Sequence, residues 1–366
     1  MKKTLPLLIF LSVFCIRPVL GQVDSTGATF AVTDTQNVKL NLFDTDDLFE
    51  ITLKFDVSGY KKAKSDTLYF DALLTYFNNE EDSVTKNIKV RARGNIRRTA
   101  VCDFPPLMLN FKMEDSTNSE FSGINKLKIV PYCKIGYESY ILKEYLVYKL
   151  YNVLTDYSLK TRLFKITYIN SGKEKKPITQ YGFAIEPMNL FEKRTETKEL
   201  KFKGLTQRSI KPEMLDRTAI FNYMIGNTDW SVPIQHNVIL FVKEKPDPDF
   251  TNLVTAYDFD YSGIVNTDYA VPFPSLPIET VRDRLYLAVC RDESVFTEAL
   301  KEFVEKKDAF YKVINEFPYL SERTKKDMVA YLENFYYGID KRNSLVRNLL
   351  NDCRWFEEQA NLKVRD

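Results

Sequence analysis

Hydrophobic and polar residues alternate along much of the first half of the chain. The alternation is regular from Glu50 to Val57, and a period of two residues predicts a β-strand with one buried face. Polar turns, Pro105-Pro106 and Gly123 separate this segment from further strand candidates, at residues 67–76, 88–90, 107–111 and 127–130. The region from about residue 48 to residue 130 is therefore predicted to be rich in β-structure.

The spacing of apolar residues then becomes helical. Residues 139–154, rich in Leu, Tyr and Val, predict a helix, and two strands are expected at 162–169 and 180–185. The charged stretch 192–203 is typical of a solvated loop or a surface helix. Three later segments carry helical spacing: 213–225, 295–315 and 321–350.

A β-rich first half followed by a helix-rich second half predicts an α+β fold with two lobes. The expected N-terminal lobe spans residues 46–187 and includes the helix at 139–154. The expected C-terminal lobe spans residues 188–366 and is mostly helical. The chain has 366 residues, of which 44% are hydrophobic, and this is enough to bury a large core.

The first 45 residues do not fit this folded pattern. Residues 1–21 predict a secretory signal peptide, because Lys2 and Lys3 precede a short apolar run and Gly21 offers a small-residue cleavage site. Residues 22–45 predict a flexible leader. No later segment approaches the roughly 20 apolar residues of a membrane-spanning helix. We therefore expect an exported protein of the periplasm, cell surface or extracellular space, without a transmembrane segment in the mature chain.

Charge and cysteine content narrow the function classes. Lys and Arg number 52 against 50 Asp and Glu, so no basic excess indicates binding to nucleic acid. Beyond the signal segment the chain holds Cys102, Cys133, Cys290 and Cys353. An oxidising destination would allow disulfides in any of three pairings. Cys102 and Cys133 flank two strand-like runs and are the favoured pair, and buried free thiols are the alternative.

Candidate chemistry is concentrated in two segments, residues 226–237 and 257–263, which the apolar stretch 238–242 separates from each other. Phosphoryl transfer needs metal-binding oxygens, cations for the phosphates and an aspartate that orients the acceptor. Asp229 is the candidate for that aspartate. Asn237 and Asp258 are candidate Mg²⁺ ligands, because amide and carboxylate oxygens suit this ion. Asp260 either joins them or holds the turn before Gly263.

The alternative is a structural role, in which Asp229 and Asp258 cap helices and stabilise turns. His236, the only histidine of the chain, lies between them. It would either orient the loop through a ring nitrogen or transfer a proton. The density of acidic and amide residues in two short segments favours a functional site.

Two lysines and a glutamate form a second candidate group. Lys126 and Lys128 alternate with apolar residues and share one face of a strand. A strand lysine in a cleft binds phosphate, whereas one facing water has no specific role. Glu144 falls on an apolar helix, where an unpaired carboxylate is costly. A Lys128–Glu144 ion pair would satisfy both groups, and an exposed Glu144 is the alternative.

Two weaker signals complete the candidate site. Residues 91–98 place four arginines around a Gly94-Asn95 turn, so Arg93, Asn95 and the turn backbone are candidates for covering phosphates. A basic surface hairpin is the alternative. Glu186 ends a strand where the two lobes would connect, and an adenine ring could lie against it.

Together these residues resemble the CotH kinase family, the spore-coat protein H-like atypical protein kinases. The resemblance covers roughly residues 88–270. It rests on Arg93-Gly94-Asn95, the strand at 127–130 followed by the Glu144 helix, Ala184-Ile185-Glu186, Asn227-Thr228-Asp229 with Asn237, and Tyr257-Asp258-Phe259-Asp260 with Ser262-Gly263.

The resemblance implies a protein-kinase-like fold, ATP and Mg²⁺ as cofactors, and phosphorylation of Ser or Thr hydroxyls of a protein. Asp229 would be the catalytic aspartate, Asn237 and Asp258 the metal ligands, and Lys128 a phosphate contact. The chain departs from the family pattern at Ile96-Arg97-Arg98, where a small polar residue is usual, and at Asn110, where a lysine is common.

Three functions remain as hypotheses. The first is a kinase-like enzyme that transfers a phosphoryl group from ATP to a protein hydroxyl. The second is an inactive pseudokinase that acts as a binding or scaffold module of the cell envelope, which the expected scarcity of ATP outside the cytoplasm favours. The third is a metal-dependent phosphoesterase built on Asp258 and Asp260, which would call for more ligands than one histidine provides.

Overall fold

The structure is a computed structural model that describes residues 41–78, 82–111, 120–172, 175–245, 252–341 and 344–362. These residues all belong to one compact unit. The predicted signal peptide, residues 1–21, and most of the predicted leader lie outside the described residues. The domain boundary expected near residue 187 stays a prediction.

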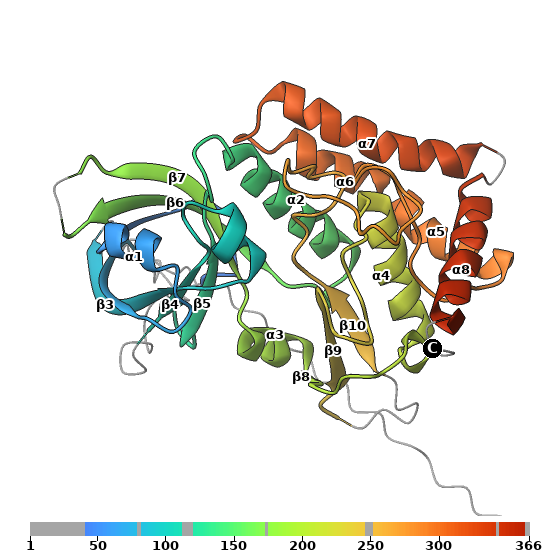
Figure 1. Cartoon of the computed structure of the whole chain (residues 1–366), viewed down its shortest axis with the longest axis horizontal. Helices are drawn as coiled ribbons and strands as arrows, with labels where there is room; N and C mark the ends of the chain where they lie inside the picture. Colours follow the sequence, from blue (N-terminus) through green and yellow to red (C-terminus); the bar gives the residue numbers. More distant parts are fainter. Residues whose placement is uncertain are drawn as a thin grey trace, which may run out of the picture. The chain divides into compact units, whose positions relative to one another are not determined.

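The chain has a mixed fold in which the β-rich part is a closed barrel rather than an open sheet (Figure 1). Its strands are hydrogen-bonded to one another in the order β1-β2-β3-β4-β5-β7-β6. A parallel pairing of β1 with β6, which places Phe49 opposite Phe164, closes it. The strands are β1 Phe49–Phe55, β2 Phe70–Phe77, β3 Ser83–Ala92, β4 Leu107–Asn110, β5 Lys126–Val130, β6 Thr161–Asn170 and β7 Ile178–Ile185. All predicted strands are present with shifted ends, and the largest difference is at β3, where the predicted strand at 88–90 is part of a strand that begins at Ser83.

Strand alternation fills the barrel with side chains. Ile51, Leu53 and Phe55 are buried while their neighbours along β1 are more exposed, and they belong to a hydrophobic core of the barrel's own. The helix α1 (Val57–Ala63) was not expected from the sequence. It begins at Asp56, whose Oδ1 accepts a hydrogen bond from the N–H of Gly59 over 2.9 Å, which is the usual role of an N-cap residue.

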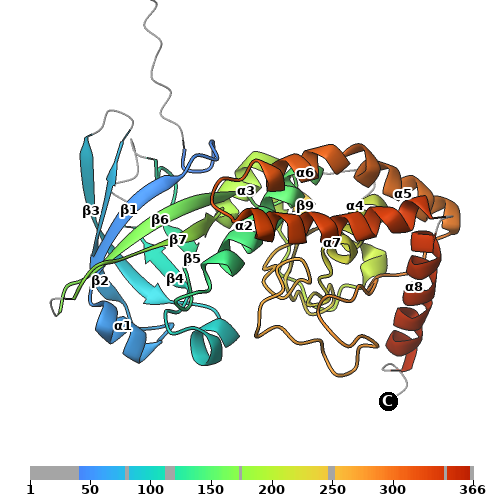
Figure 2. The ribbon, with the colours of Figure 1, turned by 90° about the horizontal axis from the view of Figure 1, so that it is seen from above.

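The second core lies among the helices. These are α2 Glu138–Leu154, α4 Pro212–Ile225, α5 Glu293–Glu305, α6 Lys307–Asn315, α7 Glu322–Asp340 and α8 Ser344–Leu362. Helix α2 packs against β6 and β7 of the barrel on one side and against α6 on the other (Figure 2). Because it is covered from both sides, α2 buries polar as well as apolar residues, including Glu144.

The helix predictions for the C-terminal part were correct in position but not in number. The expected helix at 295–315 is divided at Lys306 into α5 and α6, so that α5 packs on α4 while α6 reaches α2. The expected helix at 321–350 is likewise two helices, α7 and α8, which pack against each other. Helix α8 continues to Leu362.

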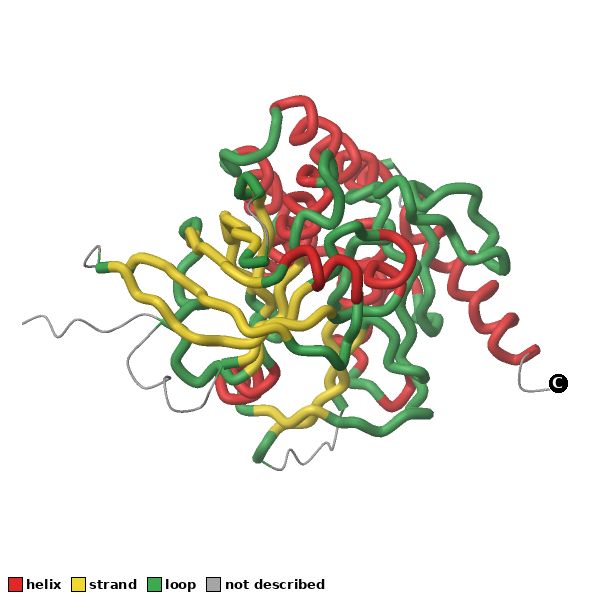
Figure 3. The backbone as a smooth tube through the Cα atoms, turned by 60° about the vertical axis from the view of Figure 1, so that its left-hand side comes forward, coloured by secondary structure: helices red, strands yellow, loops and turns green. Residues whose placement is uncertain are grey.

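A small sheet positions the loops that carry the candidate chemistry. Its strands are β8 (Thr197–Glu199), β9 (Val238–Lys243) and β10 (Leu253–Ala256), in the order β10-β9-β8. Helix α3 (Met188–Thr195) leads into β8, so the expected loop or surface helix at 192–203 is partly strand. Figure 3 separates these strands by colour from the helices around them.

Two disulfides link segments that are distant in sequence. Cys102 is bonded to Cys133, the pair that the sequence favours, and Cys290 is bonded to Cys353. Among the described helices, none is both long enough and apolar enough to cross a bilayer.

Candidate active site

The two acidic loops converge because their flanking strands are neighbours. Strands β9 and β10 pair antiparallel, with Val238 opposite Ala256. The residue before β9, Asn237, therefore lies beside the residues after β10, and its carbonyl oxygen accepts a hydrogen bond from the N–H of Tyr257 over 3.0 Å. The pairing of β9 with β10 therefore brings together two loops that are distant in the sequence.

Asp229 is held by three side chains of its own loop. Nε2 of His236 lies 2.7 Å from its Oδ1, and Nδ2 of Asn237 donates to its Oδ2 over 2.9 Å. The backbone N–H of Asp229 donates to Oδ1 of Asn227 over 3.1 Å. The carboxylate of Asp229 is thus fixed in orientation, and the amide oxygen of Asn237 accepts no hydrogen bond from the residues that the structure describes.

The hydrogen bond to Asp229 also changes the acid–base behaviour of His236. It raises the pKa of the imidazole above its ordinary value, because it stabilises the protonated ring. His236 remains about half exposed. His236 was expected either to orient its loop through a ring nitrogen or to transfer a proton. The hydrogen bond to Asp229 fits the orienting role.

The backbone is strained at the same place. Gln235, Asn237 and Asp258 have φ angles of 52°, 50° and 63°, in the left-handed region that non-glycine residues rarely adopt. Asn and Asp tolerate it better than most residues. Strained non-glycine residues cluster at functional sites, because only a surrounding structure that over-determines them keeps them there.

Glu144, Asp258 and Asp260 form a carboxylate cluster, in which one ligand oxygen of each lies within 4.8 Å of the others. Glu144 comes from α2, and the two aspartates come after β10. Burial raises the pKa of Glu144 and of Asp258, and the negative charge of Asp260 adds to the effect. Such a cluster is stable as carboxylates only with cations beside it.

Arg97 supplies one of these cations, and this corrects the predicted Lys128–Glu144 ion pair. Its Nη2 donates to Oε2 of Glu144 over 2.6 Å, and its Nε donates to Oδ2 of Asp260 over 2.7 Å. Tyr269 donates to the same oxygen of Asp260 over 2.8 Å. From the sequence, Arg97 was expected only as part of the arginine-rich turn. The sequence signal for this ion pair was a carboxylate, Glu144, on an apolar helix that follows several basic residues. This signal could not show which of the basic residues pairs with Glu144.

A cleft of 550 Å³ opens beside the cluster. Arg93, Lys128, Tyr257 and Asp258 contribute to its wall, together with the segment from Ile185 to Asn189. Nζ of Lys128 lies 5.9 Å from the centre of the Tyr257 ring. Partial removal of water and the nearby charge of Arg93 lower the pKa of Lys128.

Arg93 faces the same electrostatic environment. Burial lowers its pKa, and the charge of Asp258 partly offsets this. Its Nε is buried and has no hydrogen-bond partner in the described part of the chain. A buried unsatisfied donor on a cleft wall favours an anionic ligand there.

Two predicted site residues have other roles. The carboxylate of Glu186 accepts hydrogen bonds from Nε and Nη2 of Arg194, over 3.0 and 2.8 Å, and from the backbone N–H of Lys160. Its side chain therefore braces the segment after β7, which lines the cleft from Ile185 to Asn189. Asn95 is exposed and does not line the cleft. Its carbonyl oxygen instead accepts hydrogen bonds from Thr99.

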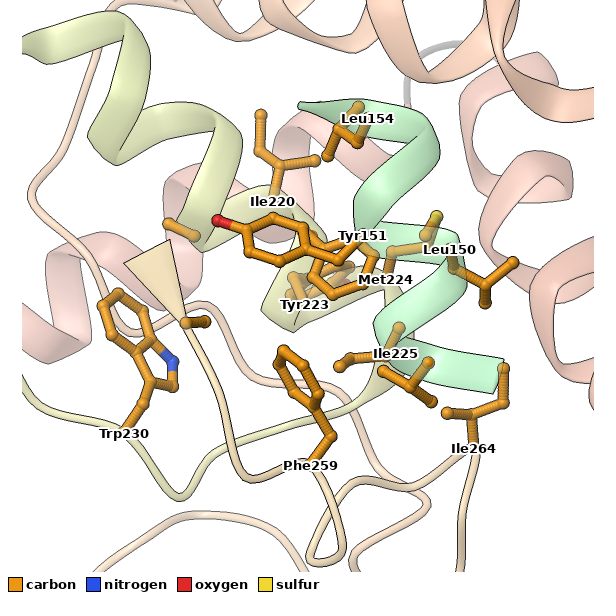
Figure 4. Packing of buried hydrophobic residues seen from close by; sticks show 14 of the residues in the cluster. Leu150, Tyr151, Leu154, Ile220, Tyr223, Met224, Ile225, Trp230, Phe259 and Ile264 are labelled. Atoms are coloured by element: carbon orange, nitrogen blue, oxygen red, sulfur yellow. The ribbon is translucent and has the colours of Figure 1, made fainter. Parts of the chain in front are cut away.

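Aromatic packing fixes both loops to the second core. Phe259, between the two aspartates, is fully buried and meets the Tyr148 ring edge-on at 4.9 Å between centroids. Figure 4 shows Phe259 and Trp230 beside residues of α2 and α4, among them Tyr151. The hydroxyl oxygen of Tyr148 also accepts a hydrogen bond from the N–H of Asp258 over 2.9 Å. The positions of Asp258 and Asp260 are thus fixed by packing of the intervening Phe259 into the second core.

No family model and no curated protein matches the sequence. Among solved structures, the chain is similar to the crystal structure of the Helicobacter pylori proinflammatory kinase CtkA, with a TM-score of 0.33 and 10% identity. The match covers 77% of this chain and 91% of that one. A TM-score this low carries no weight for function, so the resemblance to the CotH kinase family stays a prediction.

Proposed function

We propose that this protein is a kinase-like phosphotransferase that uses Mg²⁺ and transfers a phosphoryl group from ATP to a Ser or Thr hydroxyl of a protein. One observation carries the proposal. Asp258 lies on the wall of a cleft that also carries Arg93 and Lys128, it forms a carboxylate cluster with Glu144 and Asp260, and it is near enough to the oriented carboxylate of Asp229 for their charges to interact.

The residues present fit Mg²⁺ and a nucleotide. Mg²⁺ prefers oxygen ligands. The cluster offers carboxylates, and Asn237, in the loop joined to Tyr257 by a backbone hydrogen bond, offers an amide oxygen. Oε1 of Glu144 is buried without a hydrogen-bond partner in the described residues. The carboxylate of Asp258 likewise accepts no hydrogen bond from them. The cleft volume of 550 Å³ lies within the usual range for small-molecule sites.

Each residue would then have a defined task. Asp229 accepts the proton of the acceptor hydroxyl, and His236 and Asn237 keep its carboxylate in position. The acceptor oxygen forms a bond to the γ-phosphorus as the bond from that phosphorus to the bridging oxygen breaks, and ADP leaves with the electron pair. Arg93 would bind phosphate oxygens, and Asp258, Asp260 and Asn237 would hold Mg²⁺, which when bound would supply positive charge to the phosphates.

An inactive pseudokinase is the second candidate. It is favoured by the absence of a Lys128–Glu144 pair in the described structure, and by the predicted export to a place where ATP is scarce. Export itself remains a proposal that rests on residues 1–21.

The two candidates differ in the step after nucleotide binding. The purified protein is titrated with ATP in the presence of Mg²⁺ or of EDTA, with thermal shift as readout, and phosphate transfer from labelled ATP is then measured. We expect Asp258→Ala to weaken Mg²⁺-dependent binding, and Asp229→Ala to preserve binding and abolish transfer. Asp71→Ala, on the exposed face of β2, is the matched control.

The outcomes separate the hypotheses. Binding without transfer in the wild-type protein supports the pseudokinase. Equal loss of binding in Asp229→Ala and Asp258→Ala would contradict the roles given to these residues. If the wild-type protein binds ATP neither in Mg²⁺ nor in EDTA, both functions are excluded.

A further inference from the structure

Arg97 lies at the point where three separate elements meet. It begins the short π-helical turn Arg97–Val101, which comes after β3 and the Gly94 turn. Its guanidinium reaches Glu144 of α2 and Asp260 after β10, over 2.6 and 2.7 Å. The Arg97 side chain is 11% exposed and that of Glu144 is 1% exposed. An arginine so deeply placed is held by its charge partners and not by contact with water.

Lys128, the cation expected from the sequence to bind phosphate, is placed differently. Its side chain makes no ion pair or hydrogen bond within the described part of the chain, and its ammonium group lies over the Tyr257 ring. No neighbouring carboxylate of the described residues fixes its position. Catalytic and binding cations work best when their geometry is set before the ligand arrives.

We propose that Arg97, in place of Lys128, is the cation that Glu144 and Asp260 position against the phosphates of the nucleotide. This inference rests on the proposed function and deepens it. Two of the three guanidinium nitrogens of Arg97 are used by the carboxylates, and Nη1 makes no hydrogen bond to the described residues. A guanidinium can engage two carboxylates and a phosphate at once because its five N–H donors lie in one plane.

The turn that carries Arg97 is itself anchored. Cys102, the residue after the turn, donates its N–H to the carbonyl of Arg97 over 2.8 Å and is disulfide-bonded to Cys133. Cys133 comes after β5, the strand of Lys128. Arg98 binds the carbonyl oxygens of Gly94 and Lys64. The turn is therefore fixed to the barrel at both ends, which keeps Arg97 at the cluster.

Arg97 could instead act as a plug that Mg²⁺ must displace, since it neutralises two of the three cluster carboxylates. The two roles predict opposite effects of its removal. Loss of a phosphate-binding cation weakens ATP binding, whereas loss of a plug strengthens Mg²⁺ and ATP binding.

The test compares ATP with adenosine, which lacks the phosphates. Dissociation constants are measured by calorimetry in Mg²⁺ for wild type, Arg97→Ala, Arg97→Lys, Lys128→Ala and the neighbouring control Arg98→Ala. We expect Arg97→Ala to weaken ATP binding roughly 10- to 100-fold, the range for a charged hydrogen bond, with adenosine affinity unchanged. Lys128→Ala and Arg98→Ala should change the ATP-to-adenosine ratio by less than about 5-fold, and Arg97→Lys should recover part of the loss.

Arg97→Ala leaves Glu144 buried without its cation, so the double variant Arg97→Ala/Glu144→Gln is measured as well. It removes one of the two charges that Arg97 compensates, the other being that of Asp260, and it should show the same selective loss of ATP affinity. The inference is overturned if Arg97→Ala strengthens ATP binding, if ATP and adenosine affinities fall together in both variants, or if Lys128→Ala causes the larger selective loss. A wild-type protein that binds adenosine and ATP equally would also overturn it, whereas failure to bind either would overturn the proposed function.

Discussion

The backbone N–H of Gly263 donates a hydrogen bond to the carbonyl oxygen of Gly226 over 2.9 Å. Gly226 ends α4 just before the loop of Asp229, and Gly263 comes after the loop of Asp258. The hydroxyl of Tyr331, from α7, lies against both glycines. This contact fixes the two loops to each other, and neither glycine lines the cleft.

Gly263 should tolerate no side chain. A Cβ atom there would meet the carbonyl oxygen of Val281 and come within 2.5 Å of the Tyr331 hydroxyl. We expect Gly263→Ala to lower the free energy of unfolding by about 1–3 kcal/mol, as overpacking does, and to weaken Mg²⁺-dependent ATP binding. Gly172→Ala is the control, because its Cβ would meet only ordinary contacts at 3.5 Å or more. Equal, small effects of both substitutions in urea unfolding would contradict this prediction.

The single histidine makes the orientation of Asp229 directly measurable. We expect NMR titration of His236, in protein purified without a histidine tag, to give a pKa above 6.5, because the hydrogen bond to Asp229 favours the imidazolium. Asp229→Asn should return the pKa of His236 toward 6.5. An unchanged pKa in that variant would show that Asp229 does not hold the ring.

The same pKa shift predicts a pH dependence of stability. A histidine whose pKa is raised by folding stabilises the protein fully below pH 6.5, and the effect is lost as the pH rises through the pKa of the folded state. The destabilisation caused by His236→Gln should therefore be larger at pH 5.5 than at pH 8.5 in urea unfolding. The reverse order would argue against a charged His236–Asp229 pair.

Asp352, which does not line the cleft, should also make stability fall as the pH rises, but over a lower pH range than His236. Burial raises the pKa of its carboxyl to about 6, although the N–H of Tyr286 donates to it over 3.0 Å. Folding then favours the protonated form, so the wild type loses stability as the pH rises from 4 to 6. Asp352→Asn does not titrate and keeps an oxygen for Tyr286. It should be more stable than wild type at pH 8, by about 1 kcal/mol after allowance for solvent screening, with little difference at pH 3.5.

The local periodicity of the sequence predicted much of the fold. Strands of the barrel and the helices at 139–154 and 213–225 match the structure closely, because each buries one face and the spacing of apolar residues records it. Helix α1 was missed because seven residues carry too few turns for a helical period. The break at Lys306 was missed because the apolar spacing continues through it, and only packing against α2 and α4 divides the helix.

The candidate site, like the fold, could be predicted only in part from the sequence. The convergence of Asn237 with Asp258 was within reach of the sequence, because one short strand comes after the first loop and another precedes the second. The closure of the barrel by β1 and β6, the bond of Glu186 to Arg194 and the pairing of Glu144 with Arg97 were decided only by the tertiary structure. Local pattern fixes which residues are buried. It cannot choose among Arg93, Arg97 and Lys128, because these cations have similar charge and the choice depends on distance and desolvation in the folded chain.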